Sequence, residues 1–440
     1  MTVDIPGVVH QKYDGPGGDL DLARHRRDAL LAEGVSFPTA RPGTLPWLMA
    51  LKPFTMDRSL TAKVAALGTA VFAYIDAVQD LYAQRHPVVR AHLDPGTEPD
   101  LRGLDLHRRI QTFRLDLVVE QGSPVITEIE EIYGNAGKAH AMQSAYGVSY
   151  EGLFQSFANL GLSHVLVDDQ VRTYDSELAI VRRRLRTAYG QDLAVQFFSE
   201  AKLKEVKAAW RFCYTLDFGQ YDIDRRAAIT QSGIAFANPL FHGYGTKALT
   251  ALAFHPDLTP DLEGMLGAAT LGTLRSGIAE SRLLTGTEDV PALAEQRKGL
   301  VIKVTDSPAQ RAATWGSRGV YFGESSRAKW ESVLDAVRGG HLPGRPSLPA
   351  AYLLSRLIDS DRFDIAFLHP DGDRLGVMPR ARMRLAPIFF RQAGRVELVA
   401  GHATFVNTSR KVHLGQHAVC APLDWWRGGG RKHAGSDSFA

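Results

Sequence analysis

The sequence predicts an α+β protein, on three observations. Apolar residues recur at three- and four-residue steps from Leu60 to Leu81, as on an amphipathic helix, with Asp57 or Ser59 as its N-cap. Residues 113–119 and 125–130 have the apolar alternation of two strands around a short polar turn. The last third of the chain is richer in strand patterns than in helical ones. We therefore expect a helical N-terminal region followed by strand-containing regions.

The pattern divides the chain into five segments. These are a mainly helical region (1–100), an acidic hairpin with an α/β region (101–245), a region with two lysines and a glycine-containing loop (246–345), a strand-rich region (346–426) and a flexible tail (427–440). Helices are expected at 177–186, 246–286 and 325–337, and strands at 163–168, 229–236, 299–304, 319–322, 351–358, 363–369 and 379–390.

Composition excludes several classes of protein. The 440 residues carry 51 basic and 48 acidic side chains, for a net charge of +3, so no large cationic field calls for nucleic acid or anionic lipid. Cys213 and Cys420 are too few for a disulfide framework, which suits a reducing cytosol. We find no secretory signal and no run of about 18 apolar residues that would span a membrane. A soluble, cytoplasmic, globular protein is expected.

The predicted hairpin sets acidic side chains against each other. A five-residue turn places Asp116 directly opposite Glu128. Four charged side chains then share one face of the two strands: Arg114, Asp116, Glu128 and Glu130. Because like charges in this position destabilise a sheet, the three carboxylates indicate a divalent cation, and magnesium prefers such oxygen ligands. Asn135, in the loop that follows, offers a further oxygen. The alternative is a solvated polar face.

Two lysines occupy positions that suit a ligand-facing cation. Lys303 lies in an apolar strand, with Val301 on its own face, and needs an anionic partner if it is buried. An edge-strand lysine that reaches solvent is the alternative. Lys247 precedes a helical run, where a cation is mildly unfavourable against the helix dipole, so its side chain is expected to reach a ligand. Chance placement on the surface is the alternative.

Basic and small residues further along the chain suit phosphate. Arg380, Arg382 and Arg384 alternate with apolar residues, so three guanidiniums share one strand face, where they suit phosphate or carboxylate. A solvated cationic face is the alternative. The polar loop after Lys303 closes with small residues whose backbone N–H groups suit phosphate oxygens: Gly316, Ser317 and Gly319. This loop matches neither the Walker nor the dinucleotide pattern. A basic run at 410–413 suits a substrate carboxylate.

These motifs together resemble ATP-grasp ligases. Arg114-Leu-Asp116, the run from Thr127 to Glu130 and the Gly-Asn-Ala-Gly loop resemble the metal-binding region of that family. Lys247 and Lys303 resemble its two nucleotide lysines. In ordinary members the acidic strand follows the lysines, whereas here it precedes them, which resembles the circularly permuted, glutathionylspermidine-synthase-like type. The strand at 352–356 lacks the acidic or amide residue often found at the adenine hinge.

The resemblance implies an ATP-grasp-like fold with a nucleotide cleft between two α+β layers, and ATP and magnesium (Mg2+) as cofactors. Asp116, Glu128 and Glu130 would hold the metal. Nucleotide binding would involve Lys247, Lys303, Gly316, Ser317, Gly319 and Arg380. Arg382 or a neighbouring residue would stabilise the transferring phosphoryl group, and Arg114 would orient the acceptor. The γ-phosphoryl group would pass to a carboxylate, and an amine would attack the acylphosphate to give an amide.

The favoured function is therefore an ATP-dependent carboxylate–amine ligase in peptide or small-metabolite biosynthesis. Its partners would be small-molecule carboxylates and amines, with a homodimer as a possible assembly. Two alternatives stay open. One is an ATP-dependent phosphotransferase that uses the same site, and the other is a non-catalytic nucleotide-binding protein, which the sparse glycine loop favours.

Overall fold

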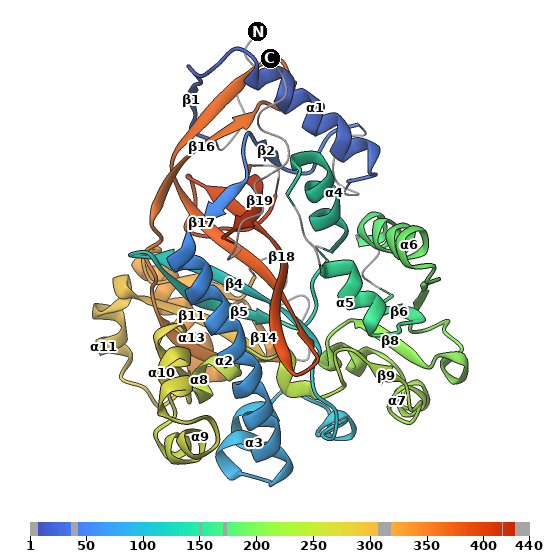
Figure 1. The fold of residues 1–440 in the computed structure, drawn as a ribbon. Coiled ribbons are helices and arrows are strands. Elements are labelled where there is room, and N and C mark those ends of the chain that lie inside the picture. The colour runs from blue at the N-terminus through green and yellow to red at the C-terminus, as the bar shows by residue number, and fades with distance from the viewer. Residues whose placement is uncertain are drawn as a thin grey trace.

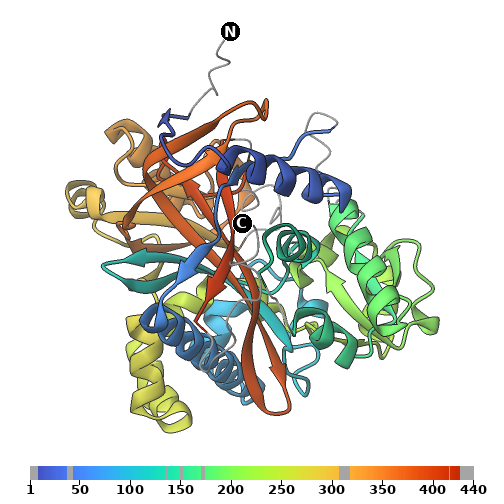
Figure 2. The same cartoon turned by 45° about the horizontal axis from the view of Figure 1, so that its top comes forward.

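The computed structural model describes residues 8–36, 43–134, 136–148, 152–169, 174–306, 318–415 and 417–426. Within these ranges the chain forms one nine-stranded sheet, two four-stranded sheets and a two-stranded ribbon, with helices packed against them. Figure 1 and Figure 2 show the long strands of the largest sheet running through the middle of the molecule. The predicted α+β class is confirmed.

The nine-stranded sheet joins the N-terminal region to the C-terminal region. Its order is β16-β2-β19-β18-β17-β4-β5, with β1 beside β17 and β3 beside β19. The strands are β1 (Gln11–Lys12), β2 (Leu48–Ala50), β3 (Phe54–Met56), β4 (Thr112–Glu120), β5 (Ser123–Glu130), β16 (Arg362–Leu368), β17 (Leu375–Gln392), β18 (Arg395–Val406) and β19 (Val419–Trp425). Because β16 also pairs with β17, five of these strands form a closed ring.

Two smaller sheets flank this one. An antiparallel sheet has the order β10 (Ser281–Leu284), β15 (Ala351–Arg356), β11 (Leu300–Asp306) and β12 (Val320–Phe322). A parallel sheet has the order β7 (Ala194–Phe197), β6 (His164–Val167), β8 (Ala208–Phe212) and β9 (Ala235–Phe236). The ribbon pairs β13 (His341–Leu342) with β14 (Arg345–Pro349). In Figure 1 the parallel sheet lies to the right of the β17–β18 hairpin.

The longest helix is α2, and it packs on the nine-stranded sheet (Figure 1). It spans Arg58–Ala83, and the Asp57 carboxylate accepts a hydrogen bond from the Leu60 N–H at 2.7 Å, so the predicted helix and cap are confirmed. By length and composition α2 could cross a membrane, but 56% of its most apolar window is buried inside the molecule. Val64, Val71 and Val78 belong to the main core, as in the core helix of a soluble protein.

The other α-helices lie around the sheets. They are α1 (Asp19–Ala32), α3 (Pro87–Leu93), α4 (Ala136–Tyr146), α5 (Leu153–Asn159), α6 (Asp175–Tyr189), α7 (Ile223–Thr230), α8 (Ala248–Leu252), α9 (Thr259–Leu266), α10 (Ala268–Ser276), α11 (Val290–Glu295) and α13 (Arg327–Gly339). Helix α6 contains the predicted helix at 177–186, and α13 corresponds to the one predicted at 325–337.

Two predicted elements are wrong in part. The strand expected at 229–236 begins as the end of α7, because Asp222 caps a helix there by accepting from the Arg225 N–H, and only β9 is extended. The helical run expected to reach residue 286 ends earlier, since β10 pairs with β15. Ten strands had no predicted counterpart: β1, β2, β3, β7, β8, β10, β13, β14, β18 and β19. The flexible tail predicted at 427–440 lies outside the described residues.

The β4–β5 hairpin reaches the predicted pairing by a different route. Its turn is only two residues, Gln121 and Gly122, both with positive φ, which suits the twist of a tight hairpin. Val118 therefore pairs with Val125, one position away from the predicted register. A bulge between Leu117 and Asp116 then restores the register, so that Asp116 does face Glu128.

Candidate functional site

A pocket lies between the nine-stranded sheet and the antiparallel four-stranded sheet. Its walls are Asp116, Val118, Thr127, Glu128, Lys247, Ala279, Val301, Lys303, Val320, Phe322, Arg356, Leu357, Ile358, Arg384, Arg410, Lys411 and Val412. Six of these side chains are basic (Lys247, Lys303, Arg356, Arg384, Arg410 and Lys411), whereas two are acidic (Asp116 and Glu128). A basic pocket with apolar walls suits a polyanion that also carries an apolar group.

The acidic hairpin forms the floor of this pocket. Asp116 is buried, and its carboxylate binds two guanidiniums: Arg114 donates from Nε to Oδ1 and Arg384 from Nη1 to Oδ2, each at 2.8 Å. Glu130 lies opposite Arg114 in the register, although it is not among the pocket walls. The hairpin thus brings the three predicted carboxylates onto one face, as the strand alternation requires.

The two lysines reach the hairpin from different elements. Lys247, at the N-cap of α8, places Nζ 2.5 Å from Oε1 of Glu128. Lys303, on β11, donates from Nζ to the carbonyl oxygen of Thr127 at 2.9 Å. Thr127 lies at the β4–β5 bulge, so the irregular register turns a backbone acceptor toward the lysine. Both lysines therefore contact the acidic hairpin in one pocket. The predicted role in nucleotide binding requires them to lie close together in this way.

The antiparallel sheet supplies the apolar wall beside Lys303. Val301 pairs with Phe322 and Lys303 with Val320, so these four side chains share one face of β11 and β12. All four line the pocket, as do Leu357 and Ile358 directly after β15. The predicted orientation of Val301 toward the side of Lys303 is thus confirmed.

Only one of the three strand arginines lines the pocket. Arg384 does so through its contact with Asp116, because β17 runs beside β4. Arg382 lies on the same strand face but is not a pocket residue, although the prediction named it first, ahead of its neighbours, for the phosphoryl group. Arg380 is exposed, with φ of +49° at a bulge where the β16–β17 register shifts. The even spacing predicted three equivalent guanidiniums, and the bulge breaks that equivalence.

The glycine loop is described only at its end. Gly319 has φ of +69° and stands directly before Val320, and its carbonyl oxygen accepts from the Val304 N–H at 2.8 Å. Gly316 and Ser317 lie outside the described residues, as does Asn135.

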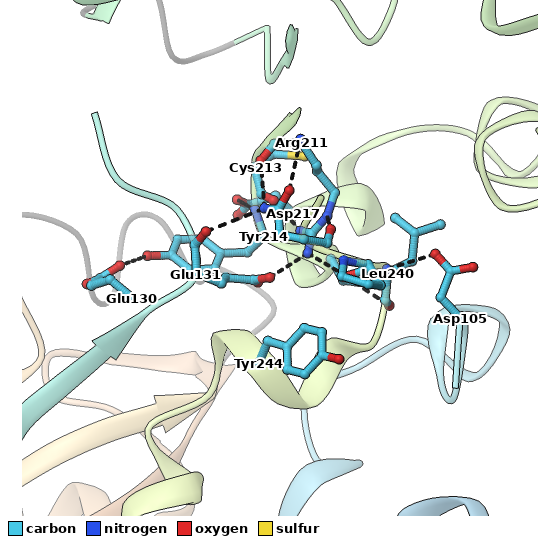
Figure 3. A network of polar contacts seen from close by, with 12 residues as sticks. Asp105, Glu130, Glu131, Arg211, Cys213, Tyr214, Asp217, Leu240 and Tyr244 are labelled. Atoms are coloured by element: carbon cyan, nitrogen blue, oxygen red, sulfur yellow. Dashed lines mark hydrogen bonds and ion pairs between the residues drawn. The ribbon is translucent and has the colours of Figure 1, made fainter. Parts of the chain in front are cut away.

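A second polar group extends the site toward the parallel sheet (Figure 3). The Tyr214 hydroxyl donates to Oε2 of Glu130 at 2.5 Å. Next to it, the fully buried Arg211 of β8 donates to Oε2 of Glu131, also at 2.5 Å, and to the carbonyl oxygen of Asn238. This network fixes the end of β5 against the carboxyl end of β8.

Burial and crowding set the electrostatics of the acidic face. Burial raises the pKa of Glu130, and the neighbouring Glu128 raises it further. Burial acts in the same direction on Glu128, but Lys247, Lys303 and Arg114 together lower its pKa below the usual value. Burial also lowers the pKa of Lys303 to about 8, with Glu128 opposing the shift. The site therefore holds carboxylates and ammonium groups close together and shielded from water.

The donor set fits magnesium. Asp116, Glu128 and Glu130 offer hard oxygen ligands on one face. Burial is the main cause of the raised pKa of Glu130, and the repulsion from Glu128 and Asp116 that adds to it is what a divalent cation would relieve. Lysines and arginines opposite them suit phosphate oxygens. The arrangement can therefore bind a metal–polyphosphate ligand and align a group for transfer.

Sequence reasoning missed several of these residues. The alternating arginine run pointed to Arg384 as one of three candidate residues. That Arg384 rather than Arg382 lines the pocket follows from the pairing of β17 with β4, which the sequence does not show. Tyr214 and Arg211 had none, because the strand that positions them was not predicted. Arg356 had been noted only as the end of a hinge strand, and it pairs with Glu120 on the hairpin at 2.8 Å.

No protein-family model matches the sequence, and no curated protein matches it. Among solved structures, the chain is similar to a glutathione synthetase-like effector from Globodera pallida in its apo form. That match has a TM-score of 0.55 and 13% identity and covers 93% of this chain and 98% of the other. A gamma-glutamylcysteine synthetase-like protein from Methylobacillus flagellatus matches with a TM-score of 0.41 and 10% identity, over 85% and 92% of the two chains. The chain therefore has a fold similar to that of the glutathione synthetase-like effector.

Proposed function

We propose that this protein is an ATP-dependent carboxylate–amine ligase, and that its fold is the permuted ATP-grasp type. The observation that carries the proposal is the meeting of Lys247, Lys303 and Arg384 with Asp116 and Glu128 in one pocket between two sheets. Its similarity to a synthetase-like fold supports the same proposal. Small-molecule acids and amines would be the substrates, and the reaction would take place in the cytoplasm.

The chain's own residues have separate tasks in this proposal. Lys247 and Lys303 would contact nucleotide phosphates, and Leu357, Ile358 and Phe322 would enclose the adenine base. Magnesium, held by Asp116, Glu128 and Glu130, would neutralise phosphate charge when bound. The carboxylate oxygens that would bind the metal are the ones that now pair with Arg114, Arg384 and Lys247. When the metal and nucleotide bind, these basic side chains would therefore pair with the phosphates instead.

Phosphoryl transfer would depend on alignment rather than on a protein nucleophile. Arg384, rather than Arg382, would stabilise the transferring phosphoryl group, because its guanidinium reaches the pocket floor. Arg114, held by Asp116 and near Glu130, would orient the acceptor carboxylate. A carboxylate oxygen then attacks the γ-phosphorus and ADP leaves. The amine displaces phosphate from the acylphosphate, losing a proton as the amide forms.

The alternative is a non-catalytic nucleotide-binding protein. One observation favours it: both carboxylate oxygens of Asp116 already accept from guanidiniums, so the site is neutralised without a ligand. A protein that only binds a nucleotide would need the basic pocket, but Asp116 could stay paired with Arg114 and Arg384.

ADP release measured against a panel of carboxylic acids, with and without amines, tests the proposal. We expect magnesium-dependent ADP formation that needs both an acid and an amine, with an amide product detected by mass spectrometry. ADP release with an acid alone would identify a phosphotransferase. Calorimetric binding of ATP and magnesium without turnover on any pair would instead identify the binding protein.

A further inference from the structure

Two arginines face each other on neighbouring strands beside the pocket. Arg362 of β16 pairs directly with Arg382 of β17 in antiparallel register. Like charges in directly opposed positions destabilise a sheet, as the acidic pair on the hairpin would without its cations. An anion bound between or above the two guanidiniums would relieve this repulsion.

The described residues supply too few acceptors for this pair. The side chain of Arg382 forms no hydrogen bond or ion pair within the described part of the chain, and its Nε is buried without a partner. Nη1 of Arg362 is likewise buried and unpartnered, although Nη2 of the same residue binds Asp359 at 3.0 Å. An unsatisfied buried donor destabilises the folded protein, and more so when it is charged, so an external acceptor would be a clear gain.

A third guanidinium comes from the loop between β18 and β19. Arg410 donates to Oδ1 of Asp359 at 2.9 Å and also binds Glu324. Asp359 therefore serves both Arg362 and Arg410 through one oxygen, while Arg382 has no carboxylate contact. Burial lowers the pKa of Arg382, and the positive charges of Arg362 and Arg410 lower it further. The carboxylates of Asp359 and Glu324 oppose this shift, but three guanidiniums face only two carboxylates, so the group keeps one net positive charge.

The position of this group relates it to the pocket. Arg410 is itself a pocket wall. Arg382 precedes Arg384 by two residues on the same strand face, a separation of about 7 Å along a strand. Arg384 already pairs with the carboxylate of Asp116. Arg382 makes no such contact, so its guanidinium is available to a different anion.

We propose that Arg362, Arg382 and Arg410 form a second anion site, which binds a carboxylate or phosphate group of the ligand that reacts with the nucleotide. Planar guanidiniums suit both anions through paired N–H donors. The identity of the ligand as a co-substrate rests on the proposed function, whereas the anion site does not. The second substrate would then carry a negative charge remote from its reacting group.

Calorimetric titration of the full chain with inorganic phosphate and with succinate tests the site, with and without saturating magnesium and a non-hydrolysable ATP analogue. We expect at least one anion to bind in both conditions, and Arg382→Gln and Arg362→Gln to weaken it at least tenfold. Arg395→Gln, an exposed arginine on β18, should leave it unchanged. Binding by succinate would assign the site to a ligand carboxylate, and binding by phosphate alone would assign it to a phosphate group.

Asp359→Asn should change anion affinity in the direction opposite to the two arginine variants. Removing the competing carboxylate should strengthen anion binding at least threefold, which a variant that simply misfolds would not do. Equal affinity in the wild type, Arg382→Gln, Arg362→Gln and Asp359→Asn would overturn the proposal, as would loss of anion binding when the nucleotide analogue is added. If the analogue does not bind but phosphate still needs the arginines, the anion site stands and the ligase proposal fails.

Discussion

Glu128 is the residue on which the proposed metal and nucleotide roles meet, since its carboxylate lines the pocket and pairs with Lys247. Glu128→Gln keeps the shape and the lysine contact but removes the negative charge. We expect magnesium-dependent ADP formation to fall at least a hundredfold, with the far-UV circular dichroism spectrum unchanged. The matched control is Glu397→Gln, an exposed carboxylate on β18, which should retain full activity. Normal turnover in the Glu128 variant would remove the carboxylate from the metal site.

The proposed contact of Lys303 with nucleotide phosphates predicts that nucleotide affinity depends on pH. Burial lowers its pKa to about 8, so the side chain is charged at pH 7 and loses its proton as the pH rises through that value. Affinity for nucleotide measured by calorimetry should therefore fall between pH 7 and pH 9. Lys303→Arg keeps its charge throughout this range and should flatten the profile. The same slope in both proteins would show that another group is responsible.

At the scale of elements, the sequence predicted the hairpin but not its irregularity. Alternation placed Asp116, Glu128 and Glu130 on one face, and this was right because side-chain period is a local property of a strand. The bulge at Thr127 lies where the hairpin packs against β17 and β11, and local patterns do not encode that packing, whereas the short turn had a local signal in Gly122. The parallel sheet was predicted only in part for the same reason, so Tyr214 and Arg211 were missed.

The buried pair between β8 and the end of β5 is expected to hold these elements together. Burial raises the pKa of Glu131 to about 7, although Arg211 opposes the shift. Arg211→Met leaves this carboxyl buried without its partner and should cost about 3–5 kcal/mol in urea unfolding. Arg211→Met combined with Glu131→Leu should recover much of that loss. The exposed ion pair of Arg186 with Asp192 provides the control, since Arg186→Met should cost less than about 1 kcal/mol. Equal losses at both sites would mean that the buried pair has no special role.

At the scale of the whole molecule, the pocket lies between sheets built from distant parts of the chain. The α+β class was predictable because helix and strand periods are visible in the sequence. The closed ring of strands was not, because it unites segments near residues 50, 365 and 420, and no local pattern reports such long-range pairing. The five proposed segment boundaries remain predictions, and the hairpin of the second segment shares its sheet with strands of the fourth.

This construction predicts how ligand binding should spread through the molecule. Asp116 and Glu128 belong to the nine-stranded sheet, whereas Lys303 and Phe322 belong to the antiparallel four-stranded sheet. A nucleotide with magnesium that contacts both should slow hydrogen exchange in β4–β5 and in β11–β12 together, and at 100 times its Kd should add about 2.7 kcal/mol to stability. A Lys247→Ala, Lys303→Ala double variant should show neither effect at the same concentration. Protection confined to one sheet would mean that the ligand does not bridge the pocket, because Lys303 belongs to the antiparallel sheet and the proposed metal ligands Asp116 and Glu128 to the nine-stranded sheet.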